Sequence, residues 1–182
     1  MTLLFFVNKF LAISIVLVQV GIVLAVAYLL FFKKKYPTTS TFFGRHGLLI
    51  AFLASLIAMS GSLFYSNVAG FTPCELCWFQ RIFMYPQVII LFMALWKKDK
   101  KIVDYSLALS VIGALIAGYH YLLQIGVASG LPCSAIGYSV SCVKLFVMEF
   151  GYITLPLMSF TAFLLIIVSL VFVKIYGNTS KG

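Results

Sequence analysis

The sequence predicts an all-α membrane protein, a four-helix transmembrane bundle with one additional N-terminal transmembrane helix. Two observations carry this prediction. Of the 182 residues, 63% are hydrophobic and only 9% are charged, whereas a soluble domain is about half apolar and about a quarter charged. The apolar residues also form long continuous runs, without the alternation of polar and apolar positions that a membrane β-barrel needs. This composition excludes a soluble globule and a disordered chain.

Five apolar stretches are each long enough to span the hydrocarbon core of a bilayer, which takes about 20 helical residues. They cover residues 10–32, 47–71, 78–96, 105–128 and 150–173. The predicted organisation is an additional N-terminal helix over 1–35, a cytoplasmic connector over 36–46, the four-helix bundle over 47–173 and a cytoplasmic tail over 174–182. On the fourth stretch, small residues repeat at a four-residue spacing that permits close helix packing, at Gly113, Ala114, Ala117 and Gly118.

The first apolar stretch has a second interpretation. Residues 11–24, followed by Ala25-Val26-Ala27, resemble the core and cleavage site of a signal peptide. The stretch continues to Phe32, however, and then meets three lysines, which is a stop-transfer pattern. Cleavage would also leave this basic run outside. The sequence therefore favours a retained helix over a cleaved leader, and N-terminal sequencing of the mature protein separates the two.

The basic residues are distributed as topology signals. The net charge is +9, but the charges lie in short runs between apolar stretches, which argues against a nucleic-acid-binding face. With five spans, ten cations fall on one side and three on the other, so the positive-inside rule places the N-terminus outside and the C-terminus inside. We therefore expect the cytoplasmic membrane of a bacterium, with both cysteine pairs on the oxidising, extracytoplasmic face. The inner group is Lys33, Lys34, Lys35, Arg45, Lys97, Lys98, Lys100, Lys101, Lys174 and Lys181, and the outer group is Lys9, Arg81 and Lys144.

The first cysteine pair lies where a helix is expected to begin. Thr72 and Glu75 match a capping box, and Pro73 occupies the favoured first helical position. Cys74 would then lie in the first turn, where unpaired backbone N–H groups and the helix dipole stabilise a thiolate. The thiolate is the reactive form of cysteine, so the pattern favours redox chemistry at Cys74 and its neighbour Cys77.

Arg81 follows Cys77 by four residues and therefore shares its helical face. An arginine within a span costs about 2.5–3.5 kcal/mol on insertion scales. It either snorkels to the interface or serves as the partner of an anion or ligand in a redox pocket. A structural disulfide and metal ligation also remain open for the Cys-x-x-Cys, although no histidine is expected beside either cysteine pair to complete a zinc site.

The second cysteine pair, Cys133 and Cys142, lies in a loop rich in Gly, Ser and Pro, where a disulfide either braces the loop or exchanges with incoming thiols. His120 and Gln124 lie four residues apart on the preceding helix, and His120 has a depth similar to that of Arg81. Each could be an ordinary packed polar residue. A pocket shared by Arg81 and His120 would suit a flat, polar-headed lipid such as a quinone, with aromatic walls at Trp78, Phe79, Phe83, Tyr119 and Tyr121.

These motifs together resemble the disulfide bond formation protein B family, in particular its shorter Gram-positive branch. The resemblance rests on Pro-Cys-Glu-Leu-Cys-Trp-Phe-Gln-Arg at 73–81, a following helix with Pro86, His-Tyr-Leu-Leu-Gln at 120–124, the Cys133/Cys142 loop, and Phe-Gly at 150–151 with Pro156. It covers residues 47–173. The additional N-terminal helix and the short spacing between Cys133 and Cys142 depart from the family pattern.

The resemblance implies a four-helix bundle that binds a membrane quinone, menaquinone or ubiquinone, and needs no metal. Such a protein reoxidises an extracytoplasmic thioredoxin-like thiol oxidase of the DsbA or BdbD type. The implied redox disulfides are Cys74–Cys77 and Cys133–Cys142. In the implied sequence of steps, the partner reduces Cys133–Cys142, the electrons pass to Cys74–Cys77, and Cys77 donates to the quinone. The implied quinone-binding residues are Arg81, His120 and Gln124.

Two other functions remain open at this stage. One is a membrane enzyme of the vitamin K epoxide reductase type, but its Cys-x-x-Cys would come late in the bundle, whereas here it follows the second of five helices. The other is a non-enzymatic membrane scaffold with two structural disulfides. Thiol alkylation with and without mild reductant separates the scaffold from an enzyme, because catalytic disulfides open readily.

Overall fold

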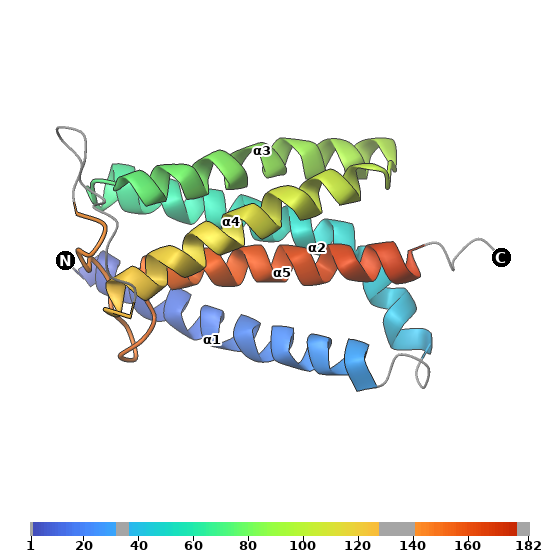
Figure 1. Ribbon diagram of the computed structural model, residues 1–182, viewed down its shortest axis with the longest axis horizontal. Coiled ribbons are helices and arrows are strands. Elements are labelled where there is room, and N and C mark those ends of the chain that lie inside the picture. Colours follow the sequence, from blue (N-terminus) through green and yellow to red (C-terminus); the bar gives the residue numbers. More distant parts are fainter. Residues whose placement is uncertain (1, 32–36, 128–140, 178–182) are drawn as a thin grey trace.

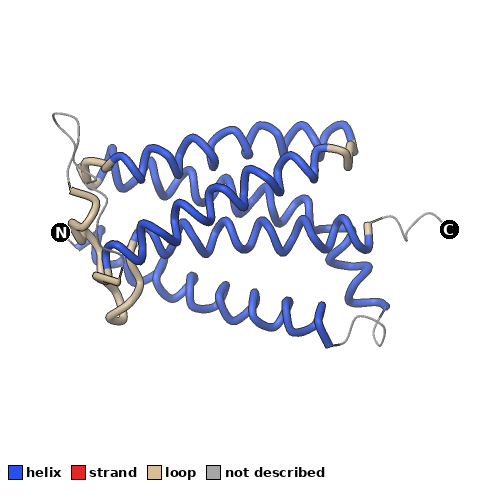
Figure 2. The backbone as a smooth tube through the Cα atoms, viewed as in Figure 1, coloured by secondary structure: helices blue, strands red, loops and turns tan. Residues whose placement is uncertain are grey.

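The computed structural model describes residues 2–31, 37–127 and 141–177, and nearly all of this part is helical (Figures 1 and 2). The elements are α1 (Thr2–Phe31), α2 (Pro37–Leu63), the π-helical turn η1 (Phe64–Val68), α3 (Glu75–Lys97), α4 (Ile102–Gln124) and α5 (Leu155–Tyr176). The five α-helices are each long and apolar enough to cross a membrane. The prediction of an all-α membrane protein is therefore confirmed.

Helices α2 to α5 form one bundle. Helix α2 packs against α3 and α5, and α4 packs against the same two helices on the other side. On α4, Gly113 faces the Phe163 ring so closely that an added methyl group would overlap it, and Gly118 faces Phe160. The predicted small-residue packing of this helix is thus confirmed. The core of the bundle comprises Leu48, Ala51, Met84, Leu91, Ala94, Val103, Ala114, Ala117, Phe163, Ile166, Leu170 and Val173.

A buried polar cluster joins α3 to α4. The Oε1 atom of Gln87 accepts hydrogen bonds from Ser106, at 2.8 Å, and from Ser110, at 3.0 Å. Its Nε2 atom donates to the Phe83 carbonyl, at 3.0 Å. In an apolar bundle such hydrogen bonds hold neighbouring helices in register. This register matters for the site, because it fixes which residue of α4 faces the beginning of α3.

Several helix boundaries differ from the sequence-based ones, among them the beginnings of α2 and α5. Helix α2 begins at Pro37, so the expected connector over 36–46 is mostly helical, as suits a proline at the first helical position. The last helix begins at Leu155 rather than at Phe150. Phe150 and Gly151 have positive φ angles of 52° and 77°, and this left-handed turn keeps the segment before Thr154 outside the helix.

One end of the bundle gathers the segments that carry the candidate site (Figure 1). The beginning of α1, the beginning of α3, the end of α4 and the beginning of α5 all lie there. The opposite end holds the short α3–α4 connection with Lys97, Lys98, Lys100 and Lys101, and the end of α5 with Lys174.

Candidate redox site

Cys74 occupies the N-cap position of α3, with an extended backbone at φ −78° and ψ 174°. The Trp78 amide donates to its carbonyl, at 3.1 Å. The expectation that Thr72 caps this helix is therefore wrong by two residues. The tertiary contacts of the buried Cys74 side chain outweigh the local capping pattern. The shift brings the sulfur itself to the helix N-terminus, where the unpaired backbone N–H groups gather.

Cys74 and Cys77 are free cysteines whose Sγ atoms lie 3.2 Å apart. Cys74 is only 4% exposed, and Cys77 is half-buried. Cys142, also buried, is disulfide-bonded. Cys133, its expected partner, lies outside the described residues. The structure thus holds the first pair as a dithiol, so that the predicted Cys74–Cys77 disulfide stays a prediction for the oxidised protein.

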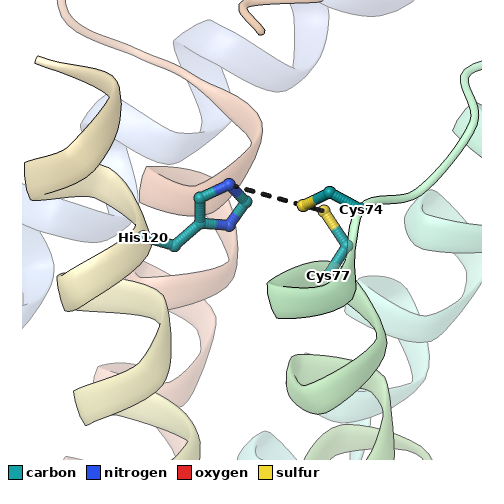
Figure 3. A group of neighbouring side chains, drawn as sticks. All are labelled: Cys74, Cys77 and His120. Carbon is teal, nitrogen blue, oxygen red and sulfur yellow. Dashed lines mark hydrogen bonds between the residues drawn. The ribbon is translucent and has the colours of Figure 1, made fainter. Parts of the chain in front are cut away.

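His120 on α4 faces the first cysteine pair across the bundle (Figure 3). Its Nε2 lies 3.7 Å from the Cys74 Sγ and 3.1 Å from the Cys142 carbonyl oxygen. The Gln80 amide donates to its Nδ1, at 2.9 Å. Because Nδ1 is the acceptor, Nε2 carries the proton and donates it toward the sulfur and the carbonyl. His120 therefore joins the two cysteine segments.

The environment of Cys74 favours its thiolate. The hydrogen bond from the Cys77 thiol is the largest influence and lowers the pKa of Cys74. Burial opposes this effect, and the hydrogen bond from His120 lowers the pKa further. A cysteine with a lowered pKa at a helix N-terminus is the usual form of a reactive thiol.

The expectation that no histidine lies beside the cysteine pairs is wrong. The Sγ atoms of Cys74 and Cys77 and a ring nitrogen of His120 all lie within 4.8 Å of one another. They are the one group in the described chain with the donor spacing for a metal ion, and its soft thiolates and imidazole would suit zinc or Cu(I). The sequence could not reveal this group, because α3 and α4 bring together residues that lie more than 40 positions apart.

A cavity of about 450 Å³ lies beside the cysteine pair, between α1, α2, α3 and α5. Arg81 lines it and is held by Ser62, whose hydroxyl accepts from Nε at 2.9 Å and whose carbonyl accepts from Nη2 at 3.1 Å. The Trp78 ring lies 5.1 Å from the guanidinium carbon. In the described chain these contacts use two of the five N–H donors of Arg81, which leaves others for a ligand.

The cavity is polar at one end and apolar at the other. Its polar end, at the cysteine end of the bundle, is lined by Ser62, Tyr65, Ser66, Thr72, Cys77, Gln80 and Arg81. Its deeper end is lined by apolar residues including Val18, Ala54 and Leu165. Ligand pockets of about 300–1,000 Å³ with a few convergent polar groups are typical for small molecules. This one fits a molecule with a polar head and an apolar tail.

Arg81 and His120 do not share a pocket. His120 lines a second, small cavity together with Cys74, Gln124 and Cys142. There Gln124 donates to the Lys144 carbonyl at 3.3 Å, and its buried Oε1 has no partner among the described residues. The five predicted aromatic wall residues are also absent from the lining of the large cavity, so that prediction is wrong. The aromatic side chains that line it are Phe10, Tyr65, Phe71, Tyr85 and Phe146.

Cys77 lines both cavities. On one side it faces the small cavity with Cys74 and Cys142, and on the other side the large cavity with Arg81. Sequence reasoning missed Ser62 and Gln80, which hold Arg81 and His120 in place. The signal available for Gln80 was a strongly polar residue within an apolar span, one position before Arg81.

Comparison with known proteins adds an independent finding. Residues 44–173 match the family model described as "Disulfide bond formation protein DsbB". The SPbeta prophage-derived disulfide bond formation protein B of Bacillus subtilis (strain 168) is 48% identical over 118 residues, which cover 65% of this chain and 78% of that protein. Disulfide bond formation protein C of the same organism is 42% identical over 126 residues, covering 68% and 89%. A probable disulfide formation protein of Oceanobacillus iheyensis is 45% identical over 124 residues, covering 66% and 83%. No solved structure gives a significant match.

Proposed function

The chain belongs to the disulfide bond formation protein B family, and from this premise we propose that it is a membrane thiol:quinone oxidoreductase. In this proposal it reoxidises an extracytoplasmic thioredoxin-like thiol oxidase and passes the electrons to a membrane quinone. The observation that carries the proposal is the position of Cys77, which lines both the thiol-bearing small cavity and the amphipathic large cavity. Such a residue can receive electrons on one side and release them on the other.

The first half of the reaction is thiol–disulfide exchange. A thiolate of the reduced partner attacks the Cys133–Cys142 disulfide, and the partner's second thiol resolves the mixed disulfide, so that the partner is oxidised and this pair is reduced. Cys142 then delivers the two electrons to the Cys74–Cys77 disulfide. The proximity of the Cys142 segment to Cys74 supports this order, because both contact the same nitrogen of His120.

The second half takes place at the large cavity. A bound quinone would accept the two electrons and two protons that are released when the Cys74–Cys77 disulfide re-forms. Arg81 supplies fixed positive charge and hydrogen-bond donors at the polar end, where negative charge would develop. Ser62 holds the guanidinium in that orientation. The apolar deeper end excludes water and accommodates an isoprenoid tail.

His120 acts on the thiol side of this scheme. Its Nε2–H donates a hydrogen bond to the Cys74 sulfur and so stabilises the Cys74 thiolate when this sulfur leaves during exchange. Gln80 fixes the tautomer that this role requires. The earlier prediction that His120 and Gln124 contact the quinone itself stays a prediction, because both line the small cavity rather than the large one.

The proposed location is the cytoplasmic membrane of a bacterium, with the N-terminus and the cysteine pairs outside and the C-terminus in the cytoplasm. The distribution of the cations supports it, since ten of the 13 Lys and Arg fall on the side away from the cysteines. That side is reducing in a bacterium, whereas the opposite side permits disulfides.

Two cysteine variants test the proposal. Purified protein is mixed under anaerobic conditions with a reduced thioredoxin-like protein and decylubiquinone, and quinol formation is followed. Cys77→Ser should abolish quinol formation, since the Cys74–Cys77 disulfide, whose formation releases the two electrons to the quinone, cannot form. Cys142→Ser should stop oxidation of the partner but retain quinol formation when a small dithiol reduces Cys74–Cys77 directly. Turnover retained by Cys77→Ser would refute the proposal.

A further inference from the structure

Helix α1 lies before residues 44–173, which match the family model, and its role is therefore not given by the family. Its sequence is almost entirely apolar, yet it contains an asparagine, a lysine and a glutamine within the membrane span. A polar side chain in a membrane span is costly unless it has a partner. The positions of Asn8, Lys9 and Gln19 therefore indicate which face of α1 packs against the rest of the protein.

All three polar side chains bond other segments of the protein. Asn8 accepts a hydrogen bond from the Tyr65 hydroxyl, at 2.8 Å. Lys9 forms an ion pair with Glu149, at 2.8 Å. Gln19 donates to Thr161 and accepts from Tyr152, both at 3.2 Å. Helix α1 is thus fixed to η1, to α5 and to the segment between Cys142 and α5.

Apolar packing holds the same face of α1. Ala12 is fully buried against Ile153 and Leu157 of the α5 region. The opposite face carries large exposed apolar side chains, among them Ile13, Leu17 and Val20. Helix α1 therefore has two different faces, as expected for a helix that packs on a protein with one side and faces lipid with the other.

The α1 backbone lies against α5 and, in the part of the chain that the structure describes, does not approach the α2 backbone closely. Between α1 and α2 lies the large cavity. Helix α1 lines this cavity from the polar end of the cavity to the apolar end, with Phe10, Leu11, Ser14, Ile15 and Val18. Without these side chains the cavity would be a groove open to lipid between α2 and α5.

We propose that α1 is a wall of the quinone cavity, and that its cavity-facing side chains set the affinity for the quinone. The inference rests on the proposed function, because it names the quinone as the occupant. It assigns a binding role to a helix that would otherwise serve only as a membrane anchor. An anchor needs length and hydrophobicity, whereas a wall needs particular residues on one face.

Matched substitutions on the two faces of α1 separate the two roles. Leu11→Trp adds bulk inside the cavity, and Leu17→Trp adds the same bulk on the lipid face. Binding of decylubiquinone to the purified full-length protein is measured by calorimetry in detergent. Since the added indole would overpack the site that the quinone fills, Leu11→Trp should weaken binding about tenfold. Leu17→Trp should bind as the wild type does.

A second pair keeps the test decisive if the larger side chain disturbs folding. Ile15→Ala enlarges the cavity, and Ile13→Ala removes the same atoms from the lipid face. Only Ile15→Ala should weaken decylubiquinone binding. Single-turnover oxidation of the reduced partner without quinone should be unchanged in both, because this step uses the second cysteine pair and not the large cavity.

The outcomes are distinguishable. If the wild type binds decylubiquinone and both members of each pair behave alike, α1 is an anchor and the inference is overturned while the proposed function stands. If the wild type binds no quinone, the proposed function fails, and the inference fails with it. Weaker binding of decylubiquinone that is confined to Leu11→Trp and Ile15→Ala would support the proposal that α1 is a wall of the quinone cavity.

Discussion

At the scale of single residues, the chemistry depends on a few hydrogen bonds that set which atom carries a proton. Gln80 fixes the protonated nitrogen of His120, and that nitrogen faces Cys74. The hydrogen bonds from Cys77 and His120 lower the pKa of Cys74 despite burial. An ordinary thiol has a pKa of about 8.5, so Cys74 keeps its thiolate at pH values where a free cysteine is protonated.

Replacement of His120 should raise the pKa of Cys74. In a Cys77→Ser background, Cys74 is the only free thiol if the second pair stays bonded, and the serine hydroxyl can still donate to it. Thiolate absorbance in the ultraviolet, followed against pH, then reports Cys74 alone. His120→Ala removes a donor to the thiolate, so the inflection should move toward the ordinary pKa of about 8.5, and less thiolate should be present at neutral pH.

The second histidine of the chain offers the matched control. His46 lies near the beginning of α2, where it bonds the Phe42 carbonyl at 3.1 Å. This part of α2 faces Tyr176 at the end of α5, at the end of the bundle opposite the first cysteine pair. His46→Ala should leave the inflection where it is. An inflection that stays constant in His120→Ala as well would contradict the role assigned to His120 and leave Cys77 and the helix N-terminus as the causes.

Residue identities were predictable from the sequence to the extent that their signals are local. Cys74, Cys77 and Arg81 stand at short spacings on one helix, and the structure places Cys77 and Arg81 in the same cavity. The resemblance to the disulfide bond formation protein B family, read from these residues, is confirmed. The contact of His120 with Cys74 was not predictable, because it depends on how α3 and α4 are aligned rather than on either helix alone.

At the scale of elements, close approach of α4 and α5 depends on a residue without a side chain. Gly113→Ala would place a methyl group inside the Phe163 ring, which is itself fully buried. The helices must then separate or the ring must move, at a cost of about 1–3 kcal/mol for overpacking. Thermal unfolding in detergent should show a lower Tm.

Gly21→Ala is the control for this substitution. Gly21 also lies inside a helix, but an added methyl group there meets nothing within 4 Å. Because alanine favours the helix more than glycine does, this variant should be as stable as the wild type or slightly more so. Equal Tm values for Gly113→Ala and the wild type would mean that the bundle adjusts at this contact without cost.

The helices were predictable as elements, but their ends and neighbours were not. Apolar runs about 20 residues long identify spans because lipid admits little else. The beginning of α5 depends on the left-handed turn at Phe150 and Gly151, and the beginning of α3 on the buried Cys74. The place of α1 beside the cavity depends on side-chain partners from distant segments, which no local pattern identifies.

At the scale of the whole molecule, the two ends of the bundle differ in chemistry. One end holds Cys74, Cys77, Cys142, His120, the small cavity and the polar end of the large cavity, and the other holds the basic α3–α4 connection and Lys174. Lys174 pairs with Asp104 at 2.7 Å, and Lys100 donates to the Gly177 carbonyl, so that the basic end is also joined across helices. This asymmetry supports the proposed orientation in the membrane. The proposed reoxidation of an extracytoplasmic thiol oxidase depends on that orientation, because it needs the cysteine end outside.

Reporter fusions test that orientation. Green fluorescent protein fused after Gly182 should fluoresce in a bacterial host, because this reporter folds in the cytoplasm, and alkaline phosphatase at the same point should be inactive. Fusion after Val127, behind four spans, should reverse both results, since it places the reporter outside. Active phosphatase after Gly182 would place the cysteines in the reducing cytoplasm. Disulfides seldom persist there, and the proposed electron path from an outer thiol oxidase would then have no starting point.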